Sequence, residues 1–317
     1  MSIQQTVFVT GASGFVGRRV VDKLACDGYE VIAGVRKPDN SAGSASKQIV
    51  FDLAKENALL AKLTGITTVI HTAARVHIMD DSATDPLAEF RKINTQGTLN
   101  LARQAAQAGV KRFIFLSSIK VNGEGTRPDQ RFTPDDDCSP DDPYGVSKYE
   151  AEKGLVALAE ETGMEVVIIR PPLVYGPGVK ANFATMMAWV KKGVPLPLGA
   201  VDNKRSMIAL DNLVNFIILC IDHPKAANEL FLIADGEDVS TTELLQKVVR
   251  AYGKKARLLP VPVSWMVFAA KLVNKEDVAN RLFSSLQIDN SKAKHLLGWQ
   301  AVTSMTQQLQ AMVEEGE

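Results

Sequence analysis

The sequence predicts an α/β protein with a doubly wound parallel sheet and a second, smaller and mostly α-helical domain. Short β-branched runs alternate with Ala- and Leu-rich helical stretches through the first half of the chain, which is the pattern of parallel βαβ units. After Arg170-Pro171-Pro172 the alternation becomes irregular and prolines interrupt it. We therefore expect a Rossmann domain over residues 1–172 and a second domain over 173–317, with segments at about 206–235 returning to the first.

The expected elements follow in chain order. Five β-branched runs predict the strands Thr6–Thr10, Glu30–Val35, Thr68–His71, Arg112–Ser117 and Val166–Arg170. Apolar residues at helical spacing predict crossover helices within Gly17–Asp27, Ala88–Ala108 and Lys148–Thr162. We see no flexible linker between the two expected domains, so we expect them to pack around a cleft that binds substrate.

Composition narrows the class of protein. A chain of 317 residues with 46% hydrophobic content can bury a large core, and 36 basic residues balance 36 acidic ones, so no global field favours nucleic acid or an anionic membrane. The three cysteines form no Cys-x-x-Cys pair, which argues against a disulfide framework and a metal site. The first residues run directly into a strand without a signal segment, so we expect a cytoplasmic protein.

One later stretch, from Leu258 to Val273, is strongly apolar. Prolines and Lys271 interrupt it, and it is too short to span a bilayer, so we expect no transmembrane segment. We predict a buried helix of the second domain here. A helix lying on a membrane surface is the alternative, because the stretch contains Trp265, Met266 and Phe268.

The turn after the first expected strand is rich in glycine. Glycines let the backbone approach a pyrophosphate, whose charge then lies at the positive end of the following helix. The spacing Gly-x-x-Gly-x-x-Gly differs from the usual dinucleotide fingerprint, but its place between a first strand and a first helix favours a dinucleotide site over a plain tight turn. The expected cofactor contacts here are Gly11, Ser13, Gly14, Phe15, Val16 and Gly17.

The end of the second strand bears on the choice of cofactor. An NAD enzyme usually offers a carboxylate there to the adenosine ribose, whereas this chain has Val35 followed by Arg36. A guanidinium can pair with a 2′-phosphate, so NADP is preferred over NAD, with a solvated Arg36 as the alternative. Asp52 and Leu53, at the expected end of the third strand, are candidates to contact the adenine end of the cofactor. Asp52 could equally belong to a surface turn.

The fourth strand is expected to end in His71-Thr72-Ala73-Ala74, whose small residues let a cofactor lie against the backbone. The expected cofactor contacts in this run are Thr72, Ala73 and Ala74. His71 could serve as a general base, but a histidine held at a strand end is more often a structural hydrogen-bond donor. Arg75 could point into the cleft and contact substrate, or belong to a solvated loop.

Three further residues predict the chemistry. Tyr144 and Lys148 are four residues apart at the start of a helical pattern, which places a phenol and an ammonium on one helix face. A phenol titrates near pH 10, so it needs a nearby positive charge to act as an acid or base at neutral pH, and Lys148 can supply that charge. Ser118, at the end of the fifth strand, can donate a hydrogen bond to a substrate oxygen. Together with a dinucleotide, these residues predict a hydride-transfer enzyme.

This set of motifs resembles the extended short-chain dehydrogenase/reductase superfamily, in its branch of nucleotide-sugar 4-epimerases, dehydratases and 4-keto reductases. It is similar to the subgroup called UDP-glucose 4-epimerase-like, although Val121-Asn122-Gly123 replaces the frequent Val-Tyr-Gly. The resemblance covers nearly the whole chain, and its markers are the glycine turn, residues 71–74, 94–100, 117–118 and 170–178, the Tyr144/Lys148 pair and residues 205–211.

The resemblance implies particular roles. Tyr144 would be the acid/base, Lys148 would bind the nicotinamide ribose, Ser118 would hold the reacting oxygen, and Arg205 would grip the nucleotide diphosphate. It also implies a homodimer as a candidate assembly. The remaining implied contacts are Asn94 and Pro171 for the cofactor, and Asn182 and Arg281 for the substrate.

Three functions compete at this stage. A reductase would use NADPH to reduce a UDP-4-keto-6-deoxy-N-acetylhexosamine for surface polysaccharide synthesis, and Arg36 favours it because a reductase draws on the reduced NADP pool. A 4-epimerase of UDP-glucose or UDP-N-acetylglucosamine would regenerate a tightly held NAD. A non-catalytic NADP-sensing regulator on the same fold is the third, and the intact Ser118, Tyr144 and Lys148 argue against it.

Overall fold

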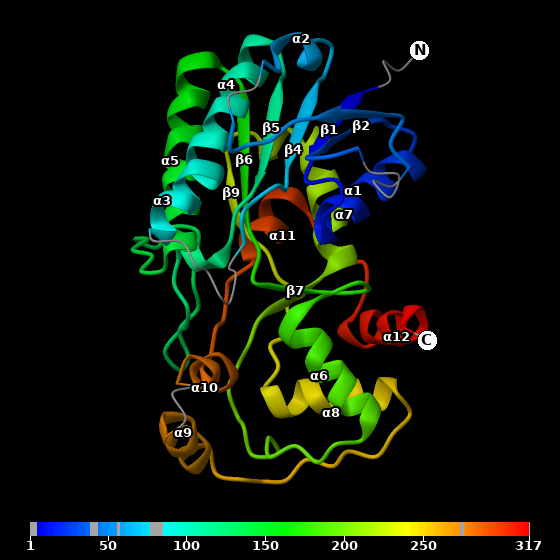
Figure 1. The fold of residues 1–317 in the computed structure, drawn as a ribbon, viewed down its shortest axis with the longest axis vertical. Coiled ribbons are helices and arrows are strands. Elements are labelled where there is room, and N and C mark those ends of the chain that lie inside the picture. The colour runs from blue at the N-terminus through cyan, green and yellow to red at the C-terminus, as the bar shows by residue number, and fades with distance from the viewer. Residues whose placement is uncertain (1–4, 39–43, 56–57, 77–84, 273–275, 317) are drawn as a thin grey trace.

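A computed structural model of the chain describes residues 5–38, 44–55, 58–76, 85–272 and 276–316. Its centre is a seven-stranded sheet with the strand order β3-β2-β1-β4-β5-β6-β9, in which every pairing is parallel (Figure 1). The strand order reverses direction at β1, so the sheet is doubly wound and the predicted fold class is confirmed. The strands are β1 Thr6–Thr10, β2 Glu30–Val35, β3 Lys47–Val50, β4 Thr68–His71, β5 Arg112–Leu116, β6 Glu165–Arg170 and β9 Leu230–Leu232.

Helices cover both faces of this sheet because its strands are apolar on both sides. On one face lie α1 Phe15–Cys26, α7 Leu210–Asp222 and α11 Ser291–Leu297; on the other lie α2 Leu60–Leu63, α4 Thr98–Gln107 and α5 Pro143–Thr162. The predicted helix at 88–108 is α3 Pro86–Phe90, a π-helical stretch η1 Arg91–Gly97, and α4 in one continuous run. Short 3₁₀ turns, η2 Ile119–Val121 and η3 Pro224–Ala226, follow β5 and α7.

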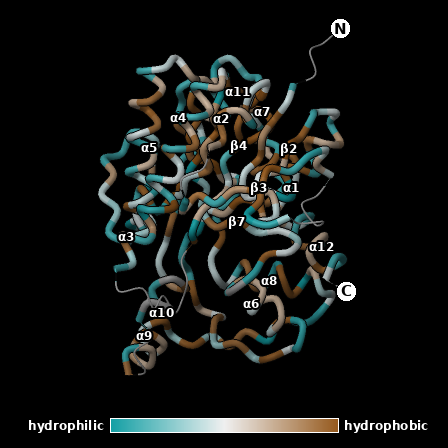
Figure 2. The backbone as a smooth tube through the Cα atoms, turned by 45° about the horizontal axis from the view of Figure 1, so that its top comes forward, coloured by the Kyte–Doolittle hydropathy of each residue, from teal (hydrophilic) through white to brown (hydrophobic). Residues whose placement is uncertain are grey.

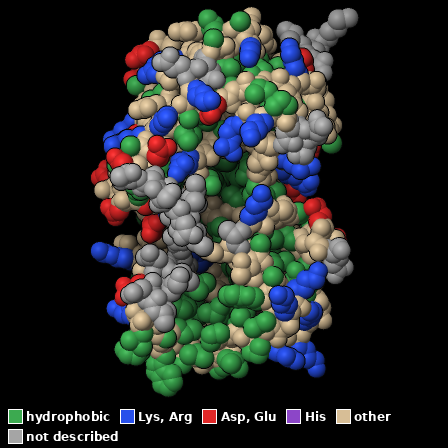
Figure 3. Space-filling model, viewed as in Figure 1, with side chains coloured by type: hydrophobic (Ala, Val, Ile, Leu, Met, Phe, Trp, Pro, Cys, Tyr) green, Lys and Arg blue, Asp and Glu red, His purple; other side chains and the backbone are tan. Residues whose placement is uncertain are grey.

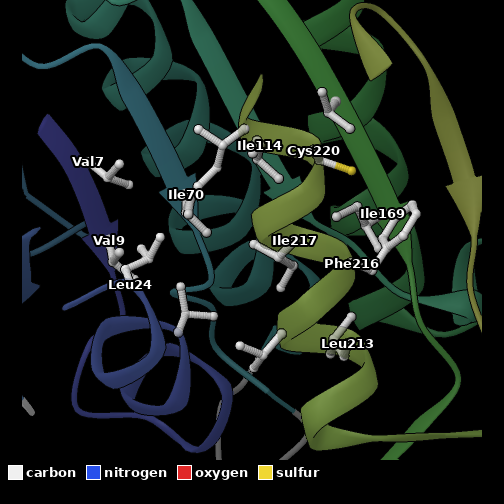
Figure 4. Close-up of a cluster of buried hydrophobic side chains, with 14 of the residues drawn as sticks. Val7, Val9, Leu24, Ile70, Ile114, Ile169, Leu213, Phe216, Ile217 and Cys220 are labelled. Carbon is white, nitrogen blue, oxygen red and sulfur yellow. The ribbon is translucent and has the colours of Figure 1, made fainter. Parts of the chain in front are cut away.

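The core between the sheet and α7 buries one face of the strands. Ile70 of β4, Ile114 of β5 and Ile169 of β6 point at Ile217 and Phe216 of α7 (Figure 4). All five side chains are at most 1% exposed. Figure 2 shows the same hydrophobic concentration along the strands. This packing fixes the strand ends, from which the candidate site is built.

The other end of the molecule holds a second core. It packs Tyr175, Met187 and Leu245 with residues from the last helix of the chain. Its elements are β7 Leu173–Tyr175 paired with β8 Met207–Ala209, α6 Ala181–Lys192, α8 Thr241–Ala251, α9 Val263–Leu272, α10 Glu276–Phe283 and α12 Met305–Glu315. Figure 3 shows this face of the molecule hollowed between the two ends.

Two local predictions were wrong. The third strand ends at Val50, so Asp52 and Leu53 lie beyond it, although Phe51 still donates its amide to the Val35 carbonyl at 3.0 Å. The predicted buried helix is α9, and none of its residues is buried; Trp265 is 71% exposed and Phe268 64%. An apolar composition indicates a helix but does not supply a partner for every face of it.

Candidate active site

The glycine turn packs directly on the loop that follows β4. Gly11 has φ +67°, and a Cβ there would lie 2.8 Å from the Ala73 nitrogen. A Cβ on Gly17 would lie 2.2 Å from the Gly11 carbonyl oxygen and 2.7 Å from Thr72 Oγ1. These two positions therefore admit only glycine, because any side chain would push the turn away from the β4 loop. The remaining glycine of the turn, Gly14, is exposed.

The first turn of α1 fits a pyrophosphate. Gly14 is the N-cap and gives the helix no side-chain cap, so the amide groups of Phe15 and Val16 have no capping oxygen. Ser13 is exposed beside them. Uncapped amides at the positive end of a helix, next to exposed backbone, are the groups that hold a dinucleotide phosphate. The residues present thus fit the pyrophosphate of a dinucleotide cofactor.

The residues expected around the adenosine lie at the ends of β2 and β3. Val35 is buried at 3% exposure, and Arg36 follows it on the surface. Asp52 Oδ1 accepts the amide of Ala54 at 3.0 Å, the pattern of an Asx turn, and Leu53 is partly buried next to it. Among these side chains Arg36 is the exposed cation.

His71 is a structural residue. Its ring is fully buried between two hydroxyls, with Nδ1 2.7 Å from Thr10 Oγ1 and Nε2 2.9 Å from Thr98 Oγ1, and it stacks on Phe115. Burial, with a smaller contribution from the Lys148 charge, lowers the pKa of His71 to about 3. A neutral imidazole with both nitrogens bonded ties β4 to its neighbours, in agreement with the structural interpretation of this histidine.

The loop after β4 is held by Asn94 in the π-helical stretch η1. The Asn94 side chain accepts the amide of Arg75 at 2.8 Å and donates to the Arg75 carbonyl and to Ser147 Oγ, both at 3.0 Å. The Arg75 guanidinium lies over the Phe90 ring. Asn94 thus joins the β4 loop to helix α5, and the Thr72 hydroxyl in the same loop donates to the Thr10 carbonyl at 2.7 Å. A π-helical turn at such a point is common in functional sites.

Ser118 and Tyr144 meet at the carboxyl end of β5. Tyr144 occupies the second position of α5, with Asp142 as the N-cap accepting the Gly145 amide at 3.2 Å. Burial and the Asp142 carboxylate raise the pKa of Tyr144 to about 12, against a hydrogen bond from Ser118 that lowers it. In the protein without a cofactor, the pKa of the phenol is therefore raised above its usual value. Ser118 and Tyr144 together can nevertheless hold one substrate oxygen.

Lys148 lies one turn further along α5 and is 1% exposed. Its Nζ donates to the Leu116 carbonyl at 2.8 Å and lies 4.4 Å from the centre of the Phe115 ring. Burial lowers the pKa of Lys148 to about 7, although the Glu152 carboxylate opposes this shift. The sequence interpretation assumed that Lys148 carries a positive charge at neutral pH. With a pKa of about 7, the amine is instead only partly protonated there.

A buried ion pair behind the site was missed from the sequence. Glu152 and Arg170 are each 4% exposed in their side chains, with Glu152 Oε2 2.5 Å from Arg170 Nη2. The Ser117 hydroxyl donates to the same carboxylate. The spacing Tyr144–Lys148–Glu152 places all three on one helix face and was the available signal. The pair joins the ends of β5 and β6 to α5, and so sets where Lys148 lies.

Three of the residues expected to bind substrate, Asn182, Arg205 and Arg281, follow residue 172. The Arg205 guanidinium donates to the Ser284 carbonyl at 3.0 Å, and burial lowers its pKa. Asn182 is exposed near the start of α6. The side chain of Arg281 lies outside the described residues. Pro171 is buried, and its carbonyl accepts the Ile119 amide at 3.0 Å beside Ser118.

Among the residues that the structure describes, no group of His, Cys, Asp and Glu residues is arranged to hold a metal ion. Likewise, none of the helices described is both long and apolar enough to cross a membrane.

The parallel sheet, the glycine turn and the Ser118/Tyr144/Lys148 group define an enzyme of the short-chain dehydrogenase/reductase class. Within that class, the chain belongs to the NAD dependent epimerase/dehydratase family, whose model matches residues 7–234. The expected superfamily is thereby confirmed.

Individual relatives agree with this placement. The chain is 49% identical over 300 residues to a protein of Vibrio cholerae named UDP-glucose 4-epimerase, covering 93% of this chain and 90% of that one. It is 29% identical to N-acetyl-alpha-D-glucosaminyl-diphospho-ditrans,octacis-undecaprenol 4-epimerase of Escherichia coli O157:H7, covering 82% and 76%. A solved structure of UDP-glucose 4-epimerase from Thermotoga maritima with UDP-glucose superposes with a TM-score of 0.78 at 26% identity, covering 98% of each chain.

Proposed function

We propose that this chain is a 4-epimerase of a nucleotide sugar, with UDP-glucose or UDP-N-acetylglucosamine as its substrate. The observation that carries the proposal is the 49% identity, over nearly the whole length of both chains, to a protein named UDP-glucose 4-epimerase. The hydrogen-bonded Ser118 and Tyr144 support it, because an epimerase needs a reversible proton carrier at the C4 oxygen.

The residues of this chain would act on the proton. Ser118 donates a hydrogen bond to the C4 oxygen and keeps it beside Tyr144. Tyr144 in its phenolate form would accept the proton of the C4 hydroxyl when the sugar is oxidised and would return it when the sugar is reduced, so no net proton is consumed. Lys148 would hold the nicotinamide ribose. A bound nicotinamide cofactor supplies reversible two-electron oxidation and reduction at C4.

A 4-keto reductase is the second candidate. The exposed Arg36, directly after a buried Val35, favours it because this position suits the 2′-phosphate of NADP. The two functions differ in their need for a reductant: an epimerase ends with its cofactor unchanged, whereas a reductase consumes NADPH in each turnover.

The deciding experiment incubates the purified protein with UDP-glucose or UDP-N-acetylglucosamine and no added reductant, and resolves the products by NMR. Conversion to the C4 epimer is expected. A second arm supplies UDP-4-keto-6-deoxy-N-acetylglucosamine with NADPH; reduction there, with no product in the first arm, would replace the epimerase by the reductase. A third arm supplies polyprenyl-diphospho-N-acetylglucosamine, because one relative is named for such a substrate.

Cofactor preference tests the role proposed for Arg36. If the protein is the reductase, it should bind NADPH more tightly than NADH, and Arg36→Ala should narrow the gap by about 10- to 100-fold, the equivalent of a charge-assisted hydrogen bond of about 1.5–3 kcal/mol. Fluorescence titration measures both affinities. Arg103→Ala, which removes an exposed arginine on α4, is the matched control. Equal affinities in the unmutated protein would reject this role.

A further inference from the structure

Helix α9 presents an apolar face that the rest of the described chain leaves exposed. Trp265, Phe268 and Leu272 are 71%, 64% and 72% exposed, and their spacing of three and four residues places them on one side of the helix. The helix packs against α10, and none of its ten residues is buried. Leu259, in the segment before α9, is 52% exposed. These four residues are called the α9 patch below.

The α9 patch lies at the end of the molecule far from the parallel sheet. Figure 3 shows hydrophobic side chains gathered over the lower end, where Figure 1 places α9 and the segment that leads to it. That segment runs beside the loop after α6, because Leu259 donates its amide to the Leu196 carbonyl at 2.8 Å and Leu196 donates to the Arg257 carbonyl at 3.0 Å. Isolated exposed apolar residues are ordinary, but four gathered at one end, two of them aromatic, indicate a binding surface.

The segments that lead into and form this patch are rich in basic residues. Residues 173–200 and 250–272 contain eight Lys and Arg residues and no Asp or Glu, in a chain whose total charge is zero. Lys254, Lys255 and Lys271 are exposed. The next acid along the chain is Glu276, at the start of α10. Exposed lysines in the same segments as exposed Trp, Phe and Leu side chains are complementary to an anionic lipid surface.

We propose that the α9 patch docks on an anionic phospholipid bilayer. In this arrangement α9 lies in the plane of the interface, Trp265 and Phe268 enter the boundary between headgroups and acyl chains, and the lysines contact lipid phosphates. With ten residues, α9 is too short to span a bilayer, so the contact is peripheral and reversible. The site residues remain in the water-facing body of the enzyme, and the docking does not depend on which sugar the enzyme uses.

Sedimentation with vesicles tests the proposal on the full-length protein. We expect binding to vesicles of phosphatidylglycerol and phosphatidylethanolamine, at least about tenfold weaker binding to phosphatidylcholine, and weakening by salt. The triple variant Trp265→Ser/Phe268→Ser/Leu272→Ser should lose binding by at least about tenfold. The matched control Leu60→Ser/Val156→Ser/Val302→Ser, which changes three exposed apolar residues elsewhere, should bind as the unmutated protein does. Circular dichroism checks that both variants are folded.

A charge reversal separates the basic contribution from the apolar one. Lys255→Glu/Lys271→Glu should weaken binding to the anionic vesicles only, whereas Lys62→Glu/Lys111→Glu, an equal change at exposed lysines far from the patch, should not. Absence of binding by the unmutated protein, or full binding by the triple variant, would overturn the proposal. It would also be overturned if the protein self-associated through α9 and ignored vesicles, a result that light scattering of the triple variant would reveal.

Discussion

At the residue scale, the candidate site holds two groups whose charged forms are disfavoured. Burial raises the pKa of the Tyr144 phenol to about 12 and lowers that of the Lys148 ammonium to about 7. Both shifts have the same physical cause, because the site is covered by Phe90, Phe115 and the end of β5, and a charge there loses its hydration. The protein alone therefore presents a protonated phenol beside an amine that is easily deprotonated.

Replacing the phenol tests its proposed role as the acid and base. Tyr144→Phe should lower kcat by at least about 100-fold, the lower bound for general acid catalysis, while cofactor affinity stays within a few-fold. Steady-state kinetics and cofactor titration measure the two quantities. Tyr149→Phe, a change to the neighbouring tyrosine, is the control and should have little effect. Near-normal turnover by Tyr144→Phe would refute the mechanism.

The pKa of Lys148 predicts a pH dependence of folding. The unfolded chain keeps the Lys148 proton up to about pH 10.5, whereas the folded protein releases it above about pH 7. Between these values the unfolded state binds more protons, so this residue makes the free energy of unfolding rise with pH, by at most about 1.4 kcal/mol per unit. Denaturant unfolding at several pH values should show that Lys148→Met flattens this rise. An unchanged slope in the variant would contradict the burial argument.

At the scale of elements, the start of α5 couples helix capping to the acid–base residue. Asp142 caps the helix through the Gly145 amide and also holds a negative charge that raises the Tyr144 pKa. The cap suits the backbone, since Asp is a favoured N-cap and Pro143 occupies the first turn. One residue thus controls both the helix and the phenol.

Substitutions at Asp142 separate its two effects. Asp142→Asn keeps a capping oxygen and removes the charge, so the Tyr144 pKa should fall and the acid limb of kcat/KM should move to lower pH. Asp142→Ala should shift the limb in the same direction and also cost about 1 kcal/mol of stability through the lost cap. Ser118→Ala removes the hydrogen bond that lowers the pKa, so its limb should move to higher pH. If the acid limb of all three variants lay at the same pH as that of the unmutated protein, Tyr144 would be excluded as the titrating group.

At the scale of the whole molecule, the parallel sheet and the second core contribute different residues. The ends of β1, β4 and β5 bring the glycine turn, the Thr72–Ala73 loop and Ser118 to one edge, where ligands of open α/β sheets bind. Arg205 instead contacts residues of the second half of the chain. Its backbone pairs with Val239, and its guanidinium donates to the Ser284 carbonyl. The division into domains at residue 172 stays a prediction, and β9 crosses it by pairing with β6.

Arg205 tests the proposed diphosphate contact. Arg205→Ala should chiefly raise KM, because a contact with the diphosphate is present in the ground state and the transition state alike. Kinetics at saturating cofactor measures this, and thermal unfolding shows whether losing the Ser284 contact also loosens α10. Arg250→Ala, an exposed arginine on α8, is the control. A large loss of kcat at constant KM would reject the diphosphate role.

The sequence by itself determined five strands of the parallel sheet, β1, β2, β4, β5 and β6, together with the glycine turn and the Tyr144/Lys148 spacing. Local patterns suffice there: β-branched runs cannot serve as helices in this alternation, and residues four apart share one helix face. Gly11 and Gly17 could also be recognised from the sequence as parts of a tight turn. Positions that have no room for a Cβ must be glycine, and the glycines are visible in the sequence.

Only the tertiary structure decided what surrounds those residues. The low pKa of Lys148, the high pKa of Tyr144 and the buried Glu152–Arg170 pair all depend on how many atoms from distant strands exclude water from α5. The exposure of α9 was decided in the same way, because an apolar helix is buried only if another element covers it. Burial is set by contacts between residues far apart in the chain, so it cannot be obtained from local pattern alone.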